Sequence, residues 1–121
     1  VVNEKGIYLP WIGYDDWSAK YWVEEMKGYF GEAAMISVKQ GKKTLSAPMK
    51  KLGADLEAKK VIYNNNPITK WCLTNVSVDI DKNNNIQPVK SQHIRRIDGF
   101  AAMLNAYVVL QDKYNDYLNM I

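Results

Sequence analysis

Two aspartates, Asp15 and Asp98, have the surroundings that best fit a site for chemistry. Asp15 directly follows the apolar and aromatic run Trp11–Tyr14, so it would stand at the carboxyl end of a strand, where α/β sheets bind ligands. Asp98 opens the clearest helical pattern, with small residues following it at i+3, i+4 and i+7: Ala101, Ala102 and Asn105. Such a stripe lets a helix approach a sheet closely, so Asp98 could reach groups held at strand ends. Clustered carboxylates hold the divalent cations of two-metal phosphodiester cleavage, although two of them are usually too few.

Both aspartates also have a purely structural interpretation. Asp15, or its neighbour Asp16, could serve as the N-cap of the helix that follows, because Asp is among the best N-cap residues. Asp98 could be a first-turn acid that the helix dipole favours. The residues alone leave both interpretations open.

Other kinds of site are disfavoured by residue type and spacing. His93 is the single histidine and Cys72 the single cysteine, so the chain has no zinc-ligand spacing and can form no intramolecular disulfide. The run Asp79-x-Asp81-x-Asn83 imitates the opening of a calcium loop but then has Asn84 and Lys90 where that loop needs Gly and Glu. A phosphate-binding glycine loop and a nucleophile elbow are missing from the sequence. Carboxylate-held metal is the remaining chemistry.

Basic residues gather in three groups along the chain. The first group (Lys39, Lys42, Lys43) and the third (Lys90, Arg95, Arg96) flank the proposed acidic site in sequence, as residues that grip phosphates would. For the middle group, Lys50, Lys51, Lys59 and Lys60, a solvated helix face is the better interpretation. The net charge of +3 permits DNA binding without arguing for it.

The elements that must position these residues follow from periodicity and from turn residues. Strand-like runs lie at Gly6–Tyr14 (its clean part Trp11–Tyr14), Ala34–Val38, Ser77–Asp81 and Ile86–Val89. Helical patterns run from Asp16 to Phe30, through Leu45, Met49, Leu52 and Leu56 with Thr44 or Ser46 as cap, from Asn66 through Val76, and from Ile97 to about Asn119. This alternation predicts an α/β fold with a mixed sheet flanked by helices.

Size and composition indicate one folded unit. The 121 residues are 47% hydrophobic, enough for one core but not for two. The sequence has no apolar run long enough to span a bilayer and no signal peptide, so we expect no membrane partner and a reducing, cytoplasmic location. The start at Val1, shortly before a strand-like run, leads us to expect a piece of a longer protein.

Several stretches together resemble the large terminase subunit of tailed phages. They are Ile12–Trp17 with Ala19, Lys39–Gly41 with Leu45–Met49, Asn64–Val76, Ile86-x-Pro88-x-Lys90 and Arg96–Ala102. Each motif is weak alone, but their collinear order over nearly the whole chain is specific. Two departures are Tyr63, where many members have His, and Asp16, where Pro or Arg is more usual.

The resemblance implies a ribonuclease H-like nuclease domain that cuts concatemeric DNA during packaging. In that family three acidic residues hold two Mg²⁺ or Mn²⁺ ions; Asp15 matches the second acid and Asp98 the third. We therefore expect residues 1–121 to be the C-terminal part of the nuclease domain, truncated, without the first strands, the first acid and the ATPase domain, and inactive alone. Implied partners are double-stranded DNA, a portal protein and the small terminase subunit, within the cytoplasm of a bacterial host and with a possible oligomer in the packaging motor.

Two rival hypotheses remain at this point. The chain could be a non-catalytic interaction module that docks to the portal or to another packaging protein, with its acids acting as helix caps. It could also be another ribonuclease H-like nuclease, such as a resolvase or integrase, although the Asn-Pro-x-x-x-Trp segment at Asn66–Trp71 argues against this.

Overall fold

A pair of parallel strands forms one end of the molecule. In the computed structural model, which describes residues 2–17 and 19–121, β1 (Ile12–Asp15) pairs with β2 (Met35–Val38) from Ile12↔Met35 to Asp15↔Val38. Parallel strands need a crossover connection, and α2 (Lys20–Phe30) with the 3₁₀ turn η1 (Glu32–Ala34) provides it. The predicted strand, helix and strand are confirmed here.

The second half of the chain supplies two helices and a hairpin. Helix α3 (Lys42–Glu57) is followed by α4 (Pro67–Asn75) and by the antiparallel strands β3 (Val76–Ile80) and β4 (Ile86–Lys90). The predicted cap of α4 is confirmed, because Oδ1 of Asn66 accepts the N–H groups of Ile68 at 3.0 Å and Thr69 at 3.1 Å. The caps expected for α3 are wrong: Gly41 is its N-cap.

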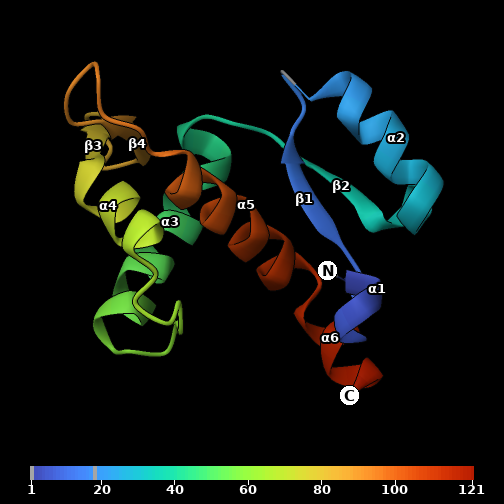
Figure 1. The fold of residues 1–121 in the computed structure, drawn as a ribbon. Coiled ribbons are helices and arrows are strands. Elements are labelled where there is room, and N and C mark those ends of the chain that lie inside the picture. Colours follow the sequence, from blue (N-terminus) through green and yellow to red (C-terminus); the bar gives the residue numbers. More distant parts are fainter. Residues whose placement is uncertain (1, 18) are drawn as a thin grey trace.

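The C-terminal helix differs in length from the expectation. A single helix to about Asn119 was expected, but α5 (Asp98–Asp112) and α6 (Tyr114–Met120) are separated at Lys113, whose φ of −106° and ψ of 12° are not helical. A short helix α1 (Val2–Lys5), not anticipated from the sequence, is drawn at the lower right of Figure 1.

Helix α5 runs through the middle of the fold. It contacts both strands of the parallel pair on one side and α3 and α4 on the other, while α3 also contacts β4 (Figure 1). The α/β class with helices flanking the strands is confirmed. Within the described residues, however, the strands form two two-stranded sheets instead of one mixed sheet, because α5 and α3 lie between the β1–β2 pair and the hairpin.

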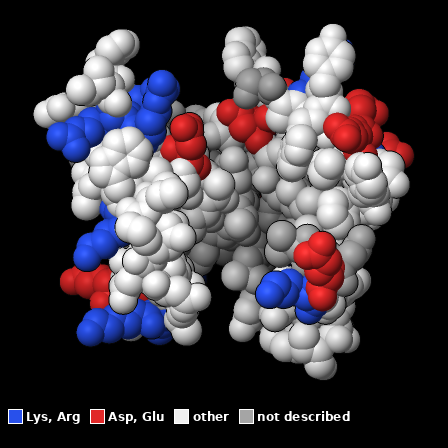
Figure 2. Space-filling model, viewed as in Figure 1, with Lys and Arg blue, Asp and Glu red and all other residues white. Residues whose placement is uncertain are grey.

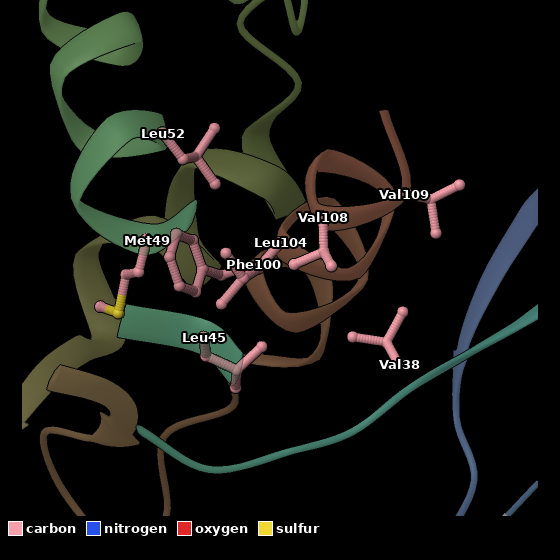
Figure 3. Close-up of a cluster of buried hydrophobic side chains, with 8 residues drawn as sticks. All are labelled: Val38, Leu45, Met49, Leu52, Phe100, Leu104, Val108 and Val109. Carbon is pink, nitrogen blue, oxygen red and sulfur yellow. The ribbon is translucent and has the colours of Figure 1, made fainter. Parts of the chain in front are cut away.

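The core joins α3, α5 and β2. It consists of eight buried side chains: Val38, Leu45, Met49, Leu52, Phe100, Leu104, Val108 and Val109. Figure 3 shows the α3 side chains facing those of α5, with Val38 closing one side and Val109 turned toward the strands. Leu52 and Leu104 are 0% and 1% exposed, and burying such a side chain stabilises the fold by about 1.5–3 kcal/mol.

Gly13 allows β1 to approach α5 backbone to backbone. A Cβ atom at this position would lie 2.8 Å from the carbonyl oxygen of Asn105 and 2.8 Å from Cγ2 of Val109. A carbon atom does not fit at either distance, and one of the two neighbours is backbone. Only glycine therefore permits this separation of strand and helix.

We expect Gly13→Ala to destabilise the fold by about 1–3 kcal/mol, because the added methyl group must push β1 away from α5. Gly28→Ala in α2 is the matched control: a Cβ atom there meets nothing within 4 Å, and Ala is favoured over Gly in a helix by about 1 kcal/mol. Urea unfolding of the two variants measures both effects. Equal stability of Gly13→Ala and the unchanged chain would contradict the tight contact.

Candidate functional site

Asp15 ends β1 and lines a hollow at the carboxyl end of the parallel strands. The hollow has a volume of about 520 Å³ and is lined by Asp15, Asp16, Trp17, Lys39 and Gln40. Oδ1 of the partly buried Asp15 accepts the N–H of Trp17 at 2.9 Å, and Oδ2 of Asp16 accepts the hydroxyl of Ser37 at 3.1 Å. Neither aspartate is the N-cap of α2, whose N-cap is Ala19, without a side-chain hydrogen bond. The capping interpretation of Asp15 and Asp16 is therefore wrong.

Asp98 is the first residue of α5 and is exposed. The N-terminal end of α5 and the carboxyl end of β1 both lie toward the top of Figure 1. Figure 2 shows acidic side chains over each of these two ends, on the same face of the molecule. Asp98 does not line the hollow that Asp15 borders. Within residues 2–17 and 19–121, no three Asp, Glu, His or Cys side chains are grouped so that they could hold a metal ion.

A polar contact that the sequence interpretation missed links the loop after β2 to α5. Nε2 of Gln40 donates to the carbonyl oxygen of Val38 at 2.9 Å and to Oδ1 of Asn105 at 3.2 Å. Asn105 is 8% exposed, and its own carbonyl oxygen borders Gly13. The sequence pattern had suggested only that Asn105 is one of the small residues on α5. An amide side chain on the apolar face of a helix could have indicated that it has a hydrogen-bond partner.

The basic residues Lys90, Arg95 and Arg96 are exposed at the end of β4 and in the loop that leads to α5. The buried Asn75 holds this loop at two points. Its side-chain Nδ2 donates to the carbonyl oxygen of Arg96 at 2.8 Å, and its backbone carbonyl oxygen accepts the N–H of Ser91 at 2.8 Å. Lys and Arg side chains gather over this region in Figure 2, next to the acidic group at the start of α5.

The first basic group also reaches the hairpin. Nζ of Lys42 lies 2.9 Å from Oδ2 of Asp79 on β3, and Asp79 also accepts Nε2 of Gln87 at 2.9 Å. The hydrogen bond from Gln87, and then the hydrogen bond from Lys42, lower the pKa of Asp79. Lys42 therefore anchors α3 to β3, which leaves Lys39 as the cation of this group at the hollow.

Asp81 has a structural role in the hairpin turn. Its Oδ1 accepts the N–H of Asn83 at 2.8 Å and of Asn85 at 2.9 Å, and these bonds, that of Asn85 foremost, lower its pKa. Asp81 thus holds the turn that joins β3 to β4.

The model of the endonuclease domain of terminase large subunits matches residues 4–113. The chain belongs to this terminase family. Protein YmfN of Escherichia coli (strain K12) is 34% identical to the terminase chain over 73 residues, which are 59% of the chain and 16% of YmfN. The crystal structure of the HK97 bacteriophage large terminase has the same fold, with a TM-score of 0.67 and 22% identity over 79% of this chain and 20% of that one.

The comparisons confirm the resemblance, and with it the packaging nuclease family. The chain spans less than a quarter of the length of either relative. None of the helices in the described part is long and apolar enough to cross a bilayer.

We expect Asn75→Ala to destabilise the terminase chain by about 1–3 kcal/mol, because a buried amide and its bond to the Arg96 carbonyl are lost. Amide hydrogen exchange should accelerate near Arg96, because the side-chain bond to its carbonyl is lost, while the backbone bond from Ser91 to residue 75 remains. Asn115→Ala, on the exposed surface of α6, is the control and should change neither quantity. Unchanged exchange in the loop of Asn75→Ala would show that Asn75 does not position Arg96.

Proposed function

We propose that this chain is part of a metal-dependent DNA endonuclease that cuts concatemeric viral DNA during packaging. Membership of the terminase endonuclease family supports the nuclease role. The observation that carries the site is the partly buried Asp15, which lines an open hollow at the carboxyl end of the parallel strands. That end of β1 and the N-terminal end of α5, where Asp98 lies, both point toward the top of Figure 1. We assign the catalytic, metal-holding positions to Asp15 and Asp98.

The chemistry of the donors fits Mg²⁺ or Mn²⁺, because hard cations take carboxylate oxygens. Oδ1 of Asp15 is occupied by the Trp17 amide, so Oδ2 is the oxygen that would face a cation. Two bound cations would activate a water molecule and stabilise the leaving oxygen of the phosphodiester. Asp15 and Asp98 would hold and orient them, with the ammonium group of Lys39 at the rim of the hollow to attract a phosphate.

A third acid would come from a part of the protein outside these 121 residues. An apolar groove of about 580 Å³ runs beside β1, and it is lined by Leu9 to Gly13, Trp22, Ala102, Ala106, Val109, Leu110 and Tyr117. Among the described residues β1 pairs only with β2, so an extended segment could add to its other edge and fill this groove. We propose that residues 1–121 are the C-terminal part of a ribonuclease H-like domain, with the first strands and the ATPase domain elsewhere in the protein.

The implied partners follow from the same assignment. Lys90, Arg95 and Arg96 would contact the phosphate backbone of double-stranded DNA, because cutting with little sequence preference depends on backbone grip more than on base readout. The portal protein and the small terminase subunit would be the protein partners in an oligomeric motor in the bacterial cytoplasm. A purely non-catalytic docking module is disfavoured, since Asp15 and Asp16 do not cap α2.

In the longer protein, Asp15→Asn and Asp98→Asn should each lower Mn²⁺-dependent DNA cleavage by a factor on the order of 100 or more, because an amide cannot supply the anionic ligand. Asp112→Asn, at the other end of α5, is the matched control and should cleave normally. Calorimetry should show that both site variants lose tight Mn²⁺ binding and that the 121 residues alone bind weakly and do not cleave. Normal cleavage by Asp98→Asn would remove Asp98 from the site.

Lys90→Ala, Arg95→Ala and Arg96→Ala should each weaken duplex DNA binding and reduce the slope of log K against log salt by about 1, because each removes one phosphate contact. Lys59 and Lys60 lie after the end of α3. Their replacement by Ala is the control and should leave the slope unchanged. Binding assays at several salt concentrations measure this. If Lys90→Ala, Arg95→Ala and Arg96→Ala all kept the slope of the unchanged protein, the DNA would have to bind on another surface.

A further inference from the structure

Trp17 exposes its indole ring at the rim of the hollow. The side chain is 92% exposed, although tryptophan is a highly buried residue on average. It lines the same hollow as Asp15, Asp16, Lys39 and Gln40. Packing within the described part of the chain gives no reason for an indole at this point.

The backbone that carries the ring is held to the sheet from both sides of the corner. The N–H of Trp17 donates to Asp15, the last residue of β1, at 2.9 Å. The neighbouring Asp16 accepts the hydroxyl of Ser37 on β2 at 3.1 Å. The backbone that carries the indole is therefore fixed relative to the carboxylate of Asp15. A side chain on which a ligand stacks needs such a fixed position.

Two of the lining residues, Trp17 and Lys39, match the two parts of a nucleotide, while Asp15 and Asp16 supply the carboxylates beside them. An indole offers a flat π face to a base, and the ammonium group of Lys39 offers a charge to a phosphate; single-stranded nucleic acid is bound by this combination. The volume of about 520 Å³ lies within the range of small-ligand sites. A paired base inside a duplex has both faces stacked on its neighbours, and inserting an indole there costs the unstacking of a base step. An unpaired base offers a face without that cost.

We propose that Trp17 stacks on an unpaired nucleobase of the DNA strand at the cleavage site, with Lys39 holding an adjacent phosphate. The inference rests on the proposed DNA-cleaving function, and it adds a contact that reads the presence of a base without reading its identity. The bound strand would be locally melted or frayed beside the candidate metal site.

The test uses the 121-residue chain labelled with 5-fluorotryptophan, which gives one ¹⁹F resonance for each of the four tryptophans. The Trp17 resonance is assigned by its loss in Trp17→Phe. The probes are a twelve-nucleotide oligothymidylate and an abasic deoxyribose-phosphate strand of equal length. Tyr21→Ala is the matched control, because Tyr21 is also 92% exposed but does not line the hollow.

The expected result is a shift of the Trp17 resonance with the oligothymidylate but not with the abasic strand. Affinity for the oligothymidylate should fall about tenfold in Trp17→Ala, largely recover in Trp17→Phe and stay unchanged in Tyr21→Ala. Equal binding of both strands, or wild-type binding by Trp17→Ala, would overturn the stacking while leaving the phosphate contacts intact. If neither strand bound, the inference would be overturned together with the DNA contacts, whereas metal-dependent cleavage is judged separately on the longer protein.

Discussion

The backbone contact between β1 and α5 at Gly13 fixes the geometry of the candidate site. Because no side chain separates the strand from the helix, the carboxyl end of β1 and the N-terminal end of α5 are held at one face. A second contact reaches α5 from the neighbouring strand. The hydrogen bond between Gln40 and Asn105 joins the loop after β2 to the helix residue whose backbone borders Gly13. Asn105 thus meets β1 through its backbone and the β2 loop through its side chain, so α5 cannot slide along one strand without losing its contact with the other.

The basic side of the molecule is positioned by a separate set of polar contacts that leads back to α5. Ser46 of α3 accepts the N–H of Ile86 at 3.0 Å, and Lys50 donates to the carbonyl oxygen of Asn84 at 2.7 Å. These bonds hold the hairpin against α3, which packs on α5 through the core (Figure 3). Asn75 then ties the hairpin exit to the residues just before Asp98. The β1–β2 pair and the hairpin are therefore both positioned against α5, although they are separate sheets.

The sequence was informative wherever local rules decide the structure. The apolar run at Ile12–Tyr14, the Asn66-Pro67 helix start and the hairpin at Val76–Lys90 depend on residue type and short spacing, and each was predicted. The caps of α2 and α3 were not, because other contacts took the polar side chains: Ser46 bonds to the hairpin, Asp16 to Ser37 on β2, and Asp15 to the nearby Trp17 amide. The division into two sheets depends on where α5 packs, and the contact at Gly13 depends on how closely β1 approaches α5. Neither feature leaves a pattern in the local sequence. Asp15 and Asp98 could be singled out from sequence, but the hollow beside Asp15, with Trp17 and Lys39 on its rim, required the structure.

Several carboxylates hold parts of the fold together through hydrogen bonds within the described residues. Asp79 is engaged by Gln87 and Lys42, Asp81 by the turn amides, and Asp55 by the hydroxyl of Tyr107. Burial, and then the bond to Asp55, raise the pKa of Tyr107 to about 12, so this bond between α3 and α5 keeps its proton at physiological pH. Among the described residues, Asp15 has the amide of Trp17 as its hydrogen-bond donor and Asp98 lies exposed in the first turn of α5. Within the described residues neither of these two aspartates bonds to a second element of the fold, whereas Asp79 ties β3 to β4 and Asp55 ties α3 to α5.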